Sequence, residues 1–488
     1  MNQKRLISLL NPIKVCGNFT GELGDLRLDS RAVQPGDVFI AVKGSQQDGH
    51  HFITSAIGNR AGAILAEHLP EVPTSVLGIE IASTGNSLGR LAQTYYDNPA
   101  DKLILNAVTG TNGKTTVTSL LYQVFALLNY RPGLLGTNAI CYGNKTYASR
   151  LTTPDATELA RIMSRMVKVE TDSVFMEVSS HALEQGRNDG ISFKTAVFTN
   201  LSHDHLDYHF SMDAYAAAKK KLFDGLSEDS IAIINADDEY AETMVADCKA
   251  EIWRLSFTDG SSQILSNTSE GLVIDIDGTV IQSSLIGRFN AYNLGLAYLA
   301  ACALGVSKNN AAAALSEVKG AEGRMERVSV SNPKVPEVFV DYAHTPDALK
   351  NVLETLQEVA KTNQKVHVVF GCGGDRDKTK RPAMAKIAHQ FADFVLVTSD
   401  NPRTENPEAI IDDIFEGFPS LDKVHRISDR EEAISYSIKN ADSDTIILIA
   451  GKGHETYQEI NGVRHDMDDR LIARKALAEF SSNAEEVV

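Results

Sequence analysis

The sequence is poor in cysteine, and the few cysteines that it has do not suit a disulfide framework. They are odd in number, lie far apart and form no CxxC pair. The five are Cys16, Cys141, Cys248, Cys302 and Cys372. Because disulfide scaffolds need paired and densely spaced cysteines, we expect free thiols in a reducing compartment, which indicates a cytoplasmic location.

Long apolar runs are also missing. The longer ones, such as 445–450, fall far short of the roughly 20 residues that a transmembrane helix needs. The apolar patch near the N-terminus covers only 6–10, which is too short for the core of a signal peptide. We therefore expect neither a membrane span nor a signal peptide.

Basic residues are too few for a protein that binds nucleic acids or membrane surfaces. The chain has 47 Lys and Arg against 64 Asp and Glu, a formal net charge of −17. Since non-specific binding to nucleic acids or anionic lipids needs a basic surface, we expect no partner of either kind. A glycine-rich loop with single basic residues can still bind phosphate locally.

The chain does contain a pattern of short apolar runs alternating with helical segments. At roughly 150 residues per domain, its 488 residues suggest three domains. The turn-rich segments 96–99 and 331–336 mark the boundaries, which gives domains at 1–98, 99–331 and 332–488. The alternation predicts an α/β fold with parallel sheets covered by helices.

The second and third domains have the clearest elements. In the second we predict strands at 103–108, 173–178, 195–199 and 231–235 and a long helix at 290–304. In the third we predict strands at 337–340, 366–370, 394–398 and 445–450, and helices at 346–360, 381–391 and 408–415. Three polar loops, 371–376, 400–403 and 451–455, follow strands of the third domain. Because ligands of open α/β sheets bind at the carboxyl ends of strands, we expect a site at these loops.

A glycine-rich segment follows the strand predicted at 103–108. Its residues are Gly110, Thr111, Asn112, Gly113, Lys114, Thr115 and Thr116. This is the short form GxxGK[ST] of a phosphate-binding loop, since Val108 stands where the longer form has glycine. Backbone N–H groups and a helix N-terminus would face the phosphates of a nucleoside triphosphate. Lys114 would reach the β- and γ-phosphates, and the Thr115 hydroxyl would bind Mg²⁺.

A second group of polar residues suits a metal. Glu177 ends the apolar strand predicted at 173–178, and a histidine-rich stretch follows at 203–209. A carboxylate beside a phosphate loop is a natural ligand of Mg²⁺, which prefers oxygen. Zinc is an alternative for the histidines, although no cysteine lies nearby. A solvated polar loop without chemistry is the other alternative.

Three lysines, Lys219, Lys220 and Lys221, follow in a helical segment. An exposed basic helix face is the simplest explanation. A lysine among cationic neighbours has a depressed pKa and more free amine, which could take up CO₂ to become a carbamate. The sequence alone does not show which of the three lysines would form the carbamate.

Six motifs, in order along nearly the whole chain, resemble those of the Mur ligases. They are GTNGKTT at 110–116, EVSSH at 177–181, DHLD at 204–207, GRFNAYN at 287–293, GRME at 323–326 and DYAHTP at 341–346. Mur ligases are ATP-dependent, amide-forming enzymes of peptidoglycan precursor synthesis. Within the family, the sequence is most similar to the members that add 2,6-diaminopimelate to UDP-N-acetylmuramoyl-L-alanyl-D-glutamate.

The resemblance implies a three-domain α/β fold and an activity. Residues 1–98 would bind the UDP-muramoyl substrate, 99–331 would form a central P-loop ATPase domain with a parallel sheet, and 332–488 a Rossmann-like domain that binds the amino acid. ATP and Mg²⁺ would be the cofactors. A monomer would join meso-2,6-diaminopimelate to the D-glutamate side-chain carboxylate through an acyl phosphate.

The resemblance also implies roles for individual residues. The catalytic residues would be Lys114, Glu177, His205 and Lys219. The metal ligands would be Thr115, Glu177, His205 and Lys219, the last carbamylated to N6-carboxylysine. Besides the phosphate loop, ATP would contact Asn290, Arg324, Asp341 and His344. Ser30 would lie in the segment that holds uridine, and the muramoyl-dipeptide would meet Thr152, Thr153, Ser179, Gln185 and Arg187. The amino-acid site would comprise Arg376, Asp400, Asn401, Pro402, Arg403, Gly451 and Glu455.

The chemistry of Arg403 agrees with a diaminopimelate site. Diaminopimelate carries a carboxylate at its far end and lysine does not, and an arginine fork suits bidentate pairing with a carboxylate. Three alternatives remain: a Mur ligase that adds another residue, a folylpolyglutamate synthase, and a non-catalytic nucleotide-binding protein. A folylpolyglutamate synthase would not need a uridine-binding domain, and a non-catalytic protein would have no reason to keep Glu177, Lys219 and Arg403.

Overall fold

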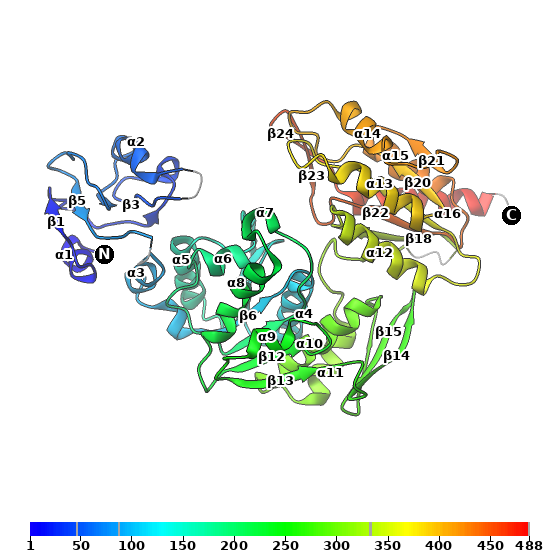
Figure 1. The fold of residues 1–488 in the computed structure, drawn as a ribbon, viewed down its shortest axis with the longest axis horizontal. Helices are drawn as coiled ribbons and strands as arrows, with labels where there is room; N and C mark the ends of the chain where they lie inside the picture. The colour runs from blue at the N-terminus through cyan, green and yellow to red at the C-terminus, as the bar shows by residue number, and fades with distance from the viewer. Residues whose placement is uncertain (45–46, 86–87, 331–333, 487–488) are drawn as a thin grey trace. The chain divides into compact units, whose positions relative to one another are not determined.

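The structure is a computed structural model that describes residues 1–44, 47–85, 88–330 and 334–486 (Figure 1). The chain forms two compact units. One comprises Met1–Ser256 and Leu296–Ala311, and the other comprises Phe257–Gly295 and Ala312–Val488. None of the helices in the described part of the chain is long and apolar enough to cross a membrane.

The first unit begins with a small sheet that contains five of the described strands. Their order is β1 (Lys14–Cys16), β5 (Leu77–Glu80), β4 (Ala63–Ala66), β3 (Val38–Ile40) and β2 (Leu26–Arg27). Only β1 runs antiparallel to its neighbour. The helices of this part are α1 (Gln3–Leu9), α2 (Ile53–Gly58) and α3 (Leu88–Tyr95). The turn before β3 needs Gly36, which has φ +89°.

The same unit contains a larger sheet with eight described strands. Their order is β13 (Glu251–Leu255), β12 (Ile231–Asn235), β11 (Thr195–Phe198), β6 (Ile104–Thr109), β10 (Ser173–Glu177), β7 (Pro132–Leu135), β8 (Ile140–Tyr142) and β9 (Lys145–Tyr147). The first six are parallel, and β8 and β9 extend the sheet as antiparallel strands. The strands expected from the four apolar runs are therefore confirmed as β6, β10, β11 and β12.

Strand β6 lies between β10 and β11, so the segments that follow these three strands meet at one edge of the sheet. The helices between the strands include α4 (Lys114–Leu127), α5 (Ala156–Lys168), α6 (Ser180–Glu184), α7 (Leu206–His209), α8 (Met212–Asp224) and α9 (Ala241–Val245). Helix α5 has a clear N-cap, because the Asp155 carboxylate accepts hydrogen bonds from the N–H groups of Thr157 and Glu158.

The second unit opens with an antiparallel sheet of β14 (Ser262–Thr268), β15 (Gly271–Ile276) and β16 (Thr279–Ser283). Helix α10 (Arg288–Ala303) confirms the long helix predicted at 290–304, and α11 (Lys308–Glu317) follows it; each of these helices has residues in both units. The sequence analysis did not anticipate the small antiparallel sheet.

The main sheet of the second unit contains six of the described strands. Their order is β17 (Glu326–Val328), β18 (Glu337–Asp341), β22 (Ile446–Ala450), β19 (Val366–Phe370), β20 (Phe394–Val397) and β21 (Val424–Arg426). All neighbours pair in parallel except β17 and β18. The loops after β19, β20 and β22 therefore emerge side by side, as the sequence predicts.

Helices cover both faces of this sheet. One apolar core includes residues of α12 (Pro346–Val359), α13 (Lys380–Phe391) and α14 (Pro407–Phe415), and the other includes residues of α15 (Arg430–Lys439) and α16 (Asp469–Glu486). Successive strand residues enter opposite cores because side chains alternate along a strand. In β22, for example, Leu448 joins the first core and Ile449 the second.

The α/β class with parallel sheets is confirmed, together with the three helices predicted in the last domain. The predicted boundary between residues 331 and 332 lies outside the described residues. The boundary after residue 98 stays a prediction, and the first compact unit spans it. A hairpin of β23 (Tyr457–Ile460) and β24 (Val463–Asp466), α15 and α16 were not predicted.

Candidate active site

The phosphate loop connects the carboxyl end of β6 to α4, whose first residue is Lys114. Gly110 has φ +147°, and a Cβ there would lie 1.9 Å from the Thr199 hydroxyl, so only glycine fits. Gly113 has φ +88° and precedes the helix. The Lys114 ammonium donates hydrogen bonds to the carbonyls of Gly110 (2.9 Å) and Thr111 (2.8 Å). The loop thus has the backbone and the cation that a triphosphate needs.

The buried Glu177 carboxylate lies at the end of β10, where Glu177 pairs in register with Val108 of the neighbouring strand β6. Its Oε2 accepts hydrogen bonds from the hydroxyls of Thr115 and Thr137, both at 3.0 Å, and its Oε1 accepts one from the Thr137 N–H at 2.8 Å. The strand pairing therefore brings together the two oxygen ligands, Thr115 and Glu177, that the sequence predicts for Mg²⁺.

The donor set at Glu177 fits Mg²⁺ better than zinc. A carboxylate and a hydroxyl are hard oxygen donors, which Mg²⁺ prefers. Zinc sites use three or four nitrogen, sulfur or carboxylate ligands. Within the described ranges, no group of three His, Cys, Asp or Glu side chains is placed to hold a metal ion.

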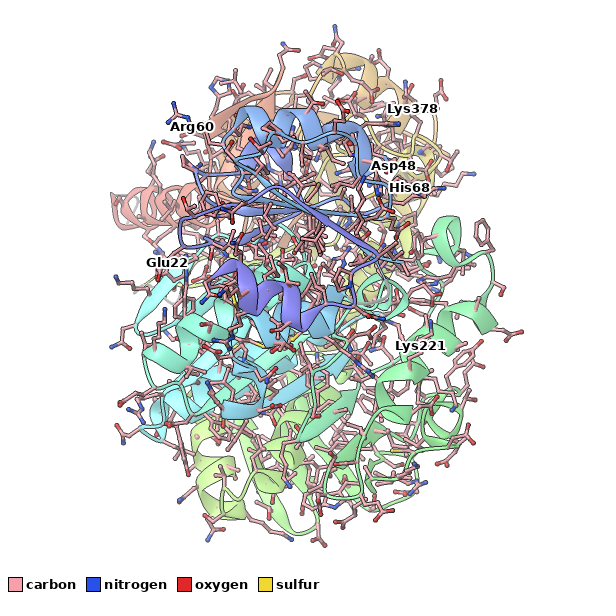
Figure 2. The ribbon with its side chains drawn as sticks, turned by 90° about the vertical axis from the view of Figure 1, so that its left-hand side faces the viewer. Glu22, Asp48, Arg60, His68, Lys221 and Lys378 are labelled. Carbon is pink, nitrogen blue, oxygen red and sulfur yellow. The ribbon has the colours of Figure 1, made fainter. Side chains whose placement is uncertain are left out.

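Lys219 is buried, with 1% of its surface exposed, whereas its two neighbours form surface ion pairs. Its Nζ donates a hydrogen bond to the Gly110 carbonyl at 2.8 Å and lies 4.6 Å from the centre of the Tyr215 ring. Burial, and then the positive charge of Lys114, lower the pKa of Lys219 well below its usual value. Lys221 projects outward from α8 (Figure 2). The exposed-face explanation is therefore wrong for Lys219.

His205 lies between β11 and α7 with φ +53° and a half-exposed side chain. Its ring centre is 5.0 Å from that of His181, and its Nε2 is 3.6 Å from an Asp204 oxygen. His209 packs at 5.5 Å from His181 and has its Nε2 2.9 Å from the Ser180 hydroxyl. Three histidines thus gather here, two of them, His205 and His209, from the histidine-rich stretch that the sequence singled out, and only His205 was predicted as a metal ligand.

The residues predicted to hold the muramoyl-dipeptide gather next to Glu177. The Thr153 hydroxyl donates to the Glu177 carbonyl (2.8 Å) and accepts from the Ser179 N–H (3.0 Å). The Arg187 guanidinium donates to the Thr153 carbonyl (2.7 Å) and to the Gln185 side-chain oxygen (2.8 Å). Burial lowers the pKa of Arg187. The remaining residue, Thr152, has its hydroxyl 3.1 Å from the Thr137 hydroxyl.

Ser30 belongs to the small N-terminal sheet region, in a short 3₁₀ helix, Ser30–Ala32. It is buried, and its carbonyl accepts a hydrogen bond from the Asn59 side chain at 2.9 Å. The structure therefore does not bring Ser30 into the cluster around Glu177.

Four residues predicted to contact ATP lie in the second unit. The Asp341 carboxylate, at the end of β18, accepts from the N–H groups of Met325 and Ala343, both at 2.7 Å, and burial raises its pKa. The Arg324 guanidinium lies 4.7 Å from the centre of the Tyr342 ring. His344 donates from Nδ1 to the Tyr342 carbonyl at 2.8 Å, and burial lowers its pKa.

Asn290 is held separately in the first turn of α10. Its side-chain nitrogen donates to the Ile286 carbonyl, and its oxygen accepts from the Asn293 side chain, both at 2.9 Å. The other three residues predicted to contact ATP surround Tyr342, which the sequence analysis did not name as a contact.

The loops after β19, β20 and β22 bring together most of the predicted amino-acid site. The Asn401 side chain donates to Glu455 Oε2 at 2.8 Å, and the Arg403 guanidinium donates to the Gly374 carbonyl at 2.8 Å. Gly451 has φ +117°, and a Cβ there would lie 2.6 Å from Asp400 Oδ2. Pro402 is buried between Asn401 and Arg403, and Arg376 is exposed on the first loop.

The hairpin β23–β24 braces the loop of Arg403. Arg403 adopts the left-handed conformation, with φ +49°. Its N–H donates to the Glu459 carbonyl at 3.0 Å, and its carbonyl accepts from the Asn461 N–H at 2.7 Å. The Gln458 side chain donates to the Asp400 carbonyl at 2.7 Å. The hairpin therefore fixes the backbone that carries the Arg403 fork.

Two buried arginines connect the site loops, and sequence reasoning missed both. Arg430 pairs with Asp469 at 2.7 Å and donates to the carbonyls of Ser399 and Ala450, which directly precede two of the loops. Arg381 pairs with Glu405 at 2.9 Å, and this contact lowers the pKa of Glu405 to about 2. The charged partners of these two arginines lie 24 and 39 residues away in sequence, so no local motif reveals the pairs.

Family descriptions match most of the chain. The model described as Mur ligase family, catalytic domain, matches residues 24–96, the Mur ligase middle domain matches 108–303, and the Mur ligase, glutamate ligase domain, matches 323–453. The chain belongs to the Mur ligase family. These three matches follow the order of the Mur ligase motifs read from the sequence.

Individual Mur ligases are similar over the full length. UDP-N-acetylmuramoyl-L-alanyl-D-glutamate–2,6-diaminopimelate ligase of Cytophaga hutchinsonii is 45% identical over 484 residues, which cover 98% of this chain and 99% of the relative. A solved structure of a ligase of the same description is 35% identical, with a TM-score of 0.66, and covers 94% of this chain and 95% of its own. A folylpolyglutamate synthase of Mycobacterium tuberculosis, 21% identical with a TM-score of 0.59, covers 74% of this chain and 91% of its own and shares the fold alone.

Proposed function

We propose that this chain is an ATP-dependent ligase that joins meso-2,6-diaminopimelate to the D-glutamate side-chain carboxylate of UDP-N-acetylmuramoyl-L-alanyl-D-glutamate, in peptidoglycan precursor synthesis. The observation that carries the proposal is the full-length similarity, 45% over 98% of the chain, to a relative that bears this activity in its name. The arrangement of Arg403, Asn401 and Glu455 at one sheet edge supports the choice of amino acid.

The reaction must activate a carboxylate, because oxide is too poor a leaving group for direct amide formation. In the first step the D-glutamate carboxylate oxygen attacks the γ-phosphorus of ATP, and the bond to the β-γ bridging oxygen breaks, which gives an acyl phosphate and ADP. In the second step the neutral amine of diaminopimelate attacks the acyl carbon. The tetrahedral intermediate loses inorganic phosphate, and the amine loses a proton.

Two anions must meet in the first step, so positive charge is needed around the phosphates. Lys114 would exchange its hydrogen bonds with Gly110 and Thr111 for the β- and γ-phosphate oxygens. The first N–H groups of α4 face the same position, where the helix dipole favours an anion. Thr115 and Glu177 would hold Mg²⁺, which supplies further positive charge to phosphate oxygens when bound.

Lys219 would carry the carbamate, and His205 would add a metal ligand. The lowered pKa of Lys219 supports this role, because more of its amine is neutral and can form an N–C bond with CO₂, with loss of a proton. Its position supports it too, since its Nζ already contacts Gly110 of the phosphate loop at 2.8 Å.

Diaminopimelate would be recognised at its far end. The Arg403 fork suits the far carboxylate, and Glu455 suits the far ammonium. Arg376 would add a contact from the loop after β19. The dipeptide would lie against Thr153, Ser179 and Arg187 beside Glu177, with its uridine near Ser30. The five free cysteines support a cytoplasmic location, and a monomeric state stays a prediction.

Phosphate release tests the proposal. The purified protein is mixed with ATP, Mg²⁺ and UDP-N-acetylmuramoyl-L-alanyl-D-glutamate, and meso-diaminopimelate or L-lysine is added in parallel. We expect release that depends on the UDP-dipeptide and on diaminopimelate and is weak with lysine. Release with lysine but not with diaminopimelate would support a ligase activity and contradict the proposed role of Arg403. Binding of ATP without release under any condition would favour a non-catalytic nucleotide-binding protein.

A further inference from the structure

Lys452 is a buried cation at the centre of the proposed amino-acid site. It follows β22, between Gly451 and Gly453, and none of its side chain is exposed. Its Nζ donates to Asn401 Oδ1 at 3.1 Å and to Glu455 Oε2 at 3.3 Å, and it lies 5.4 Å from the centre of the Tyr457 ring. Because it is fully covered by protein, it is poorly placed to be a substrate contact.

The burial of this ammonium is not explained by stability alone. Removing an ammonium from water is costly, and a well-packed apolar side chain in place of a buried ion pair is often neutral or stabilising. A buried charge that fixes the orientation of other polar groups has a separate effect, which is conformational specificity. Lys452 contacts two groups of the site, Asn401 and Glu455.

Lys452 fixes the orientation of the Asn401 amide. Asn401 Oδ1 accepts hydrogen bonds from the Lys452 ammonium and from the Glu459 N–H at 2.9 Å. Both partners are donors, so only the amide oxygen can face them, and the amide nitrogen must point the other way. That nitrogen donates to Glu455 Oε2.

Lys452 also fixes the Glu455 carboxylate. Oε2 accepts from both Asn401 and Lys452, and it belongs to a side chain that is 17% exposed. No hydrogen bond of Glu455 Oε1 is found with any residue that the structure describes. The carboxylate is therefore anchored through one oxygen, and the other oxygen can receive a substrate ammonium.

We infer that Lys452 is a positioning residue for the far end of diaminopimelate, a role that rests on the proposed function. It orients Asn401 and Glu455 as one unit, and it places a positive charge behind them that complements the far carboxylate. Lysine has an ammonium but no carboxylate at that end, so the same charge disfavours it. Lys452 thereby contributes to the choice between the two amino acids.

Lys452→Met tests this role, with Lys365→Met as the matched control. Lys365 immediately precedes β19, at the opposite edge of the same sheet, and its exposed side chain pairs with Asp442 at 3.4 Å. In the phosphate-release assay we expect Lys452→Met to raise the KM for diaminopimelate at least tenfold. The KM values for ATP and the UDP-dipeptide should stay within twofold, and the preference for diaminopimelate over lysine should fall. The control should match the wild type.

Lys452→Gln separates the hydrogen bond from the charge, because its amide can still donate to Asn401. We expect a smaller rise in the KM for diaminopimelate, about threefold or more, and this variant carries the test if Lys452→Met does not fold. An unchanged KM for diaminopimelate in a folded variant would overturn the inference. So would an equal loss for all three substrates, which indicates a general structural role. A wild type without diaminopimelate-dependent release would instead refute the proposed function, and the inference with it.

Discussion

Arg403→Ala should raise the KM for diaminopimelate about thirtyfold and leave the KM for ATP unchanged. Truncating one partner of a buried, hydrogen-bonded charge pair costs about 2–5 kcal/mol. The Arg403 side chain is only partly buried, and one of its N–H groups is already used by the Gly374 carbonyl. The lower end, about 2 kcal/mol, is therefore appropriate, and at about 1.36 kcal/mol per tenfold this is roughly a thirtyfold effect.

The assay is the initial rate of phosphate release at saturating ATP and UDP-dipeptide, with diaminopimelate varied. Arg426→Ala is a suitable control, since Arg426 ends the neighbouring strand β21 and pairs with Glu408 and Asp412 of α14 rather than with a site loop. The control should keep the wild-type KM, because exposed ion pairs contribute about 1 kcal/mol or less and only to stability.

The discrimination against lysine gives a second readout of the same variant. Without the Arg403 fork, the far carboxylate loses its partner and the two amino acids should become more alike as substrates. A KM for diaminopimelate within twofold of the wild type would refute the pairing. A fall in kcat with no change in KM would also refute it, because the residue would then act on the chemical steps instead of on recognition.

Three further predictions concern the phosphate site, stability and pH. Lys219→Ala should abolish phosphate release, and short carboxylates should partly restore it, whereas Lys221→Ala should be nearly normal; full activity of the first variant would contradict the carbamate. Asp469→Asn should lower the free energy of unfolding by about 3–5 kcal/mol, because it leaves the buried Arg430 without its counter-charge. Urea unfolding followed by circular dichroism measures this free energy, and an unchanged unfolding midpoint would contradict the prediction. Burial lowers the pKa of His367 to about 4, whereas a histidine in an unfolded chain has a pKa of roughly 6.5. As the pH falls from about 6.5 to 4, the unfolded state therefore binds a proton that the folded state does not, and the folded state loses stability. His367→Leu should make unfolding less sensitive to acid in that window, and an identical pH dependence would refute this assignment.

Local patterns predicted most of the regular structure of the two large sheets. Apolar runs of five or six residues, such as 366–370, are typical of strands buried on both faces, and the helices between them follow from their spacing. The phosphate loop was equally readable, because its glycines and Lys114 must lie between a strand and a helix. These features depend on neighbours in sequence, which is why sequence alone reveals them.

Two features were missed although the sequence contained a signal. Asn461-Gly462 separates two short strands, and both residues have positive φ, +48° and +76°, as a tight hairpin turn requires. Lys219 lies four residues after Tyr215 and three before Leu222, so it falls on the buried stripe of α8. The hairpin and the burial of Lys219 were therefore predictable from turn chemistry and helical periodicity.

The polar network around Lys452 was not predictable in the same way. It joins Asn401 to Glu455, which are 54 residues apart, through contacts that exist only once β20 and β22 occupy the same sheet. The family motifs predicted the residues that we propose face the substrate. The charges behind them, including Arg381 and Arg430, became visible only from burial and hydrogen bonding in the folded chain.

The position of β22 between β18 and β19 has a consequence for synthesis on the ribosome. Strands β18 and β19 emerge first, yet neither can gain its shared partner until Ile446–Ala450 has been made. At about 5–20 residues per second, the stretch from Phe370 to Ile446, which is 446 − 370 = 76 residues, takes several seconds to translate. During that interval the nascent chain exposes two unpaired strand edges, which are templates for aggregation. The last sheet therefore cannot be completed before β22 has been synthesised, although four of its six described strands precede β22 by at least 446 − 397 = 49 residues.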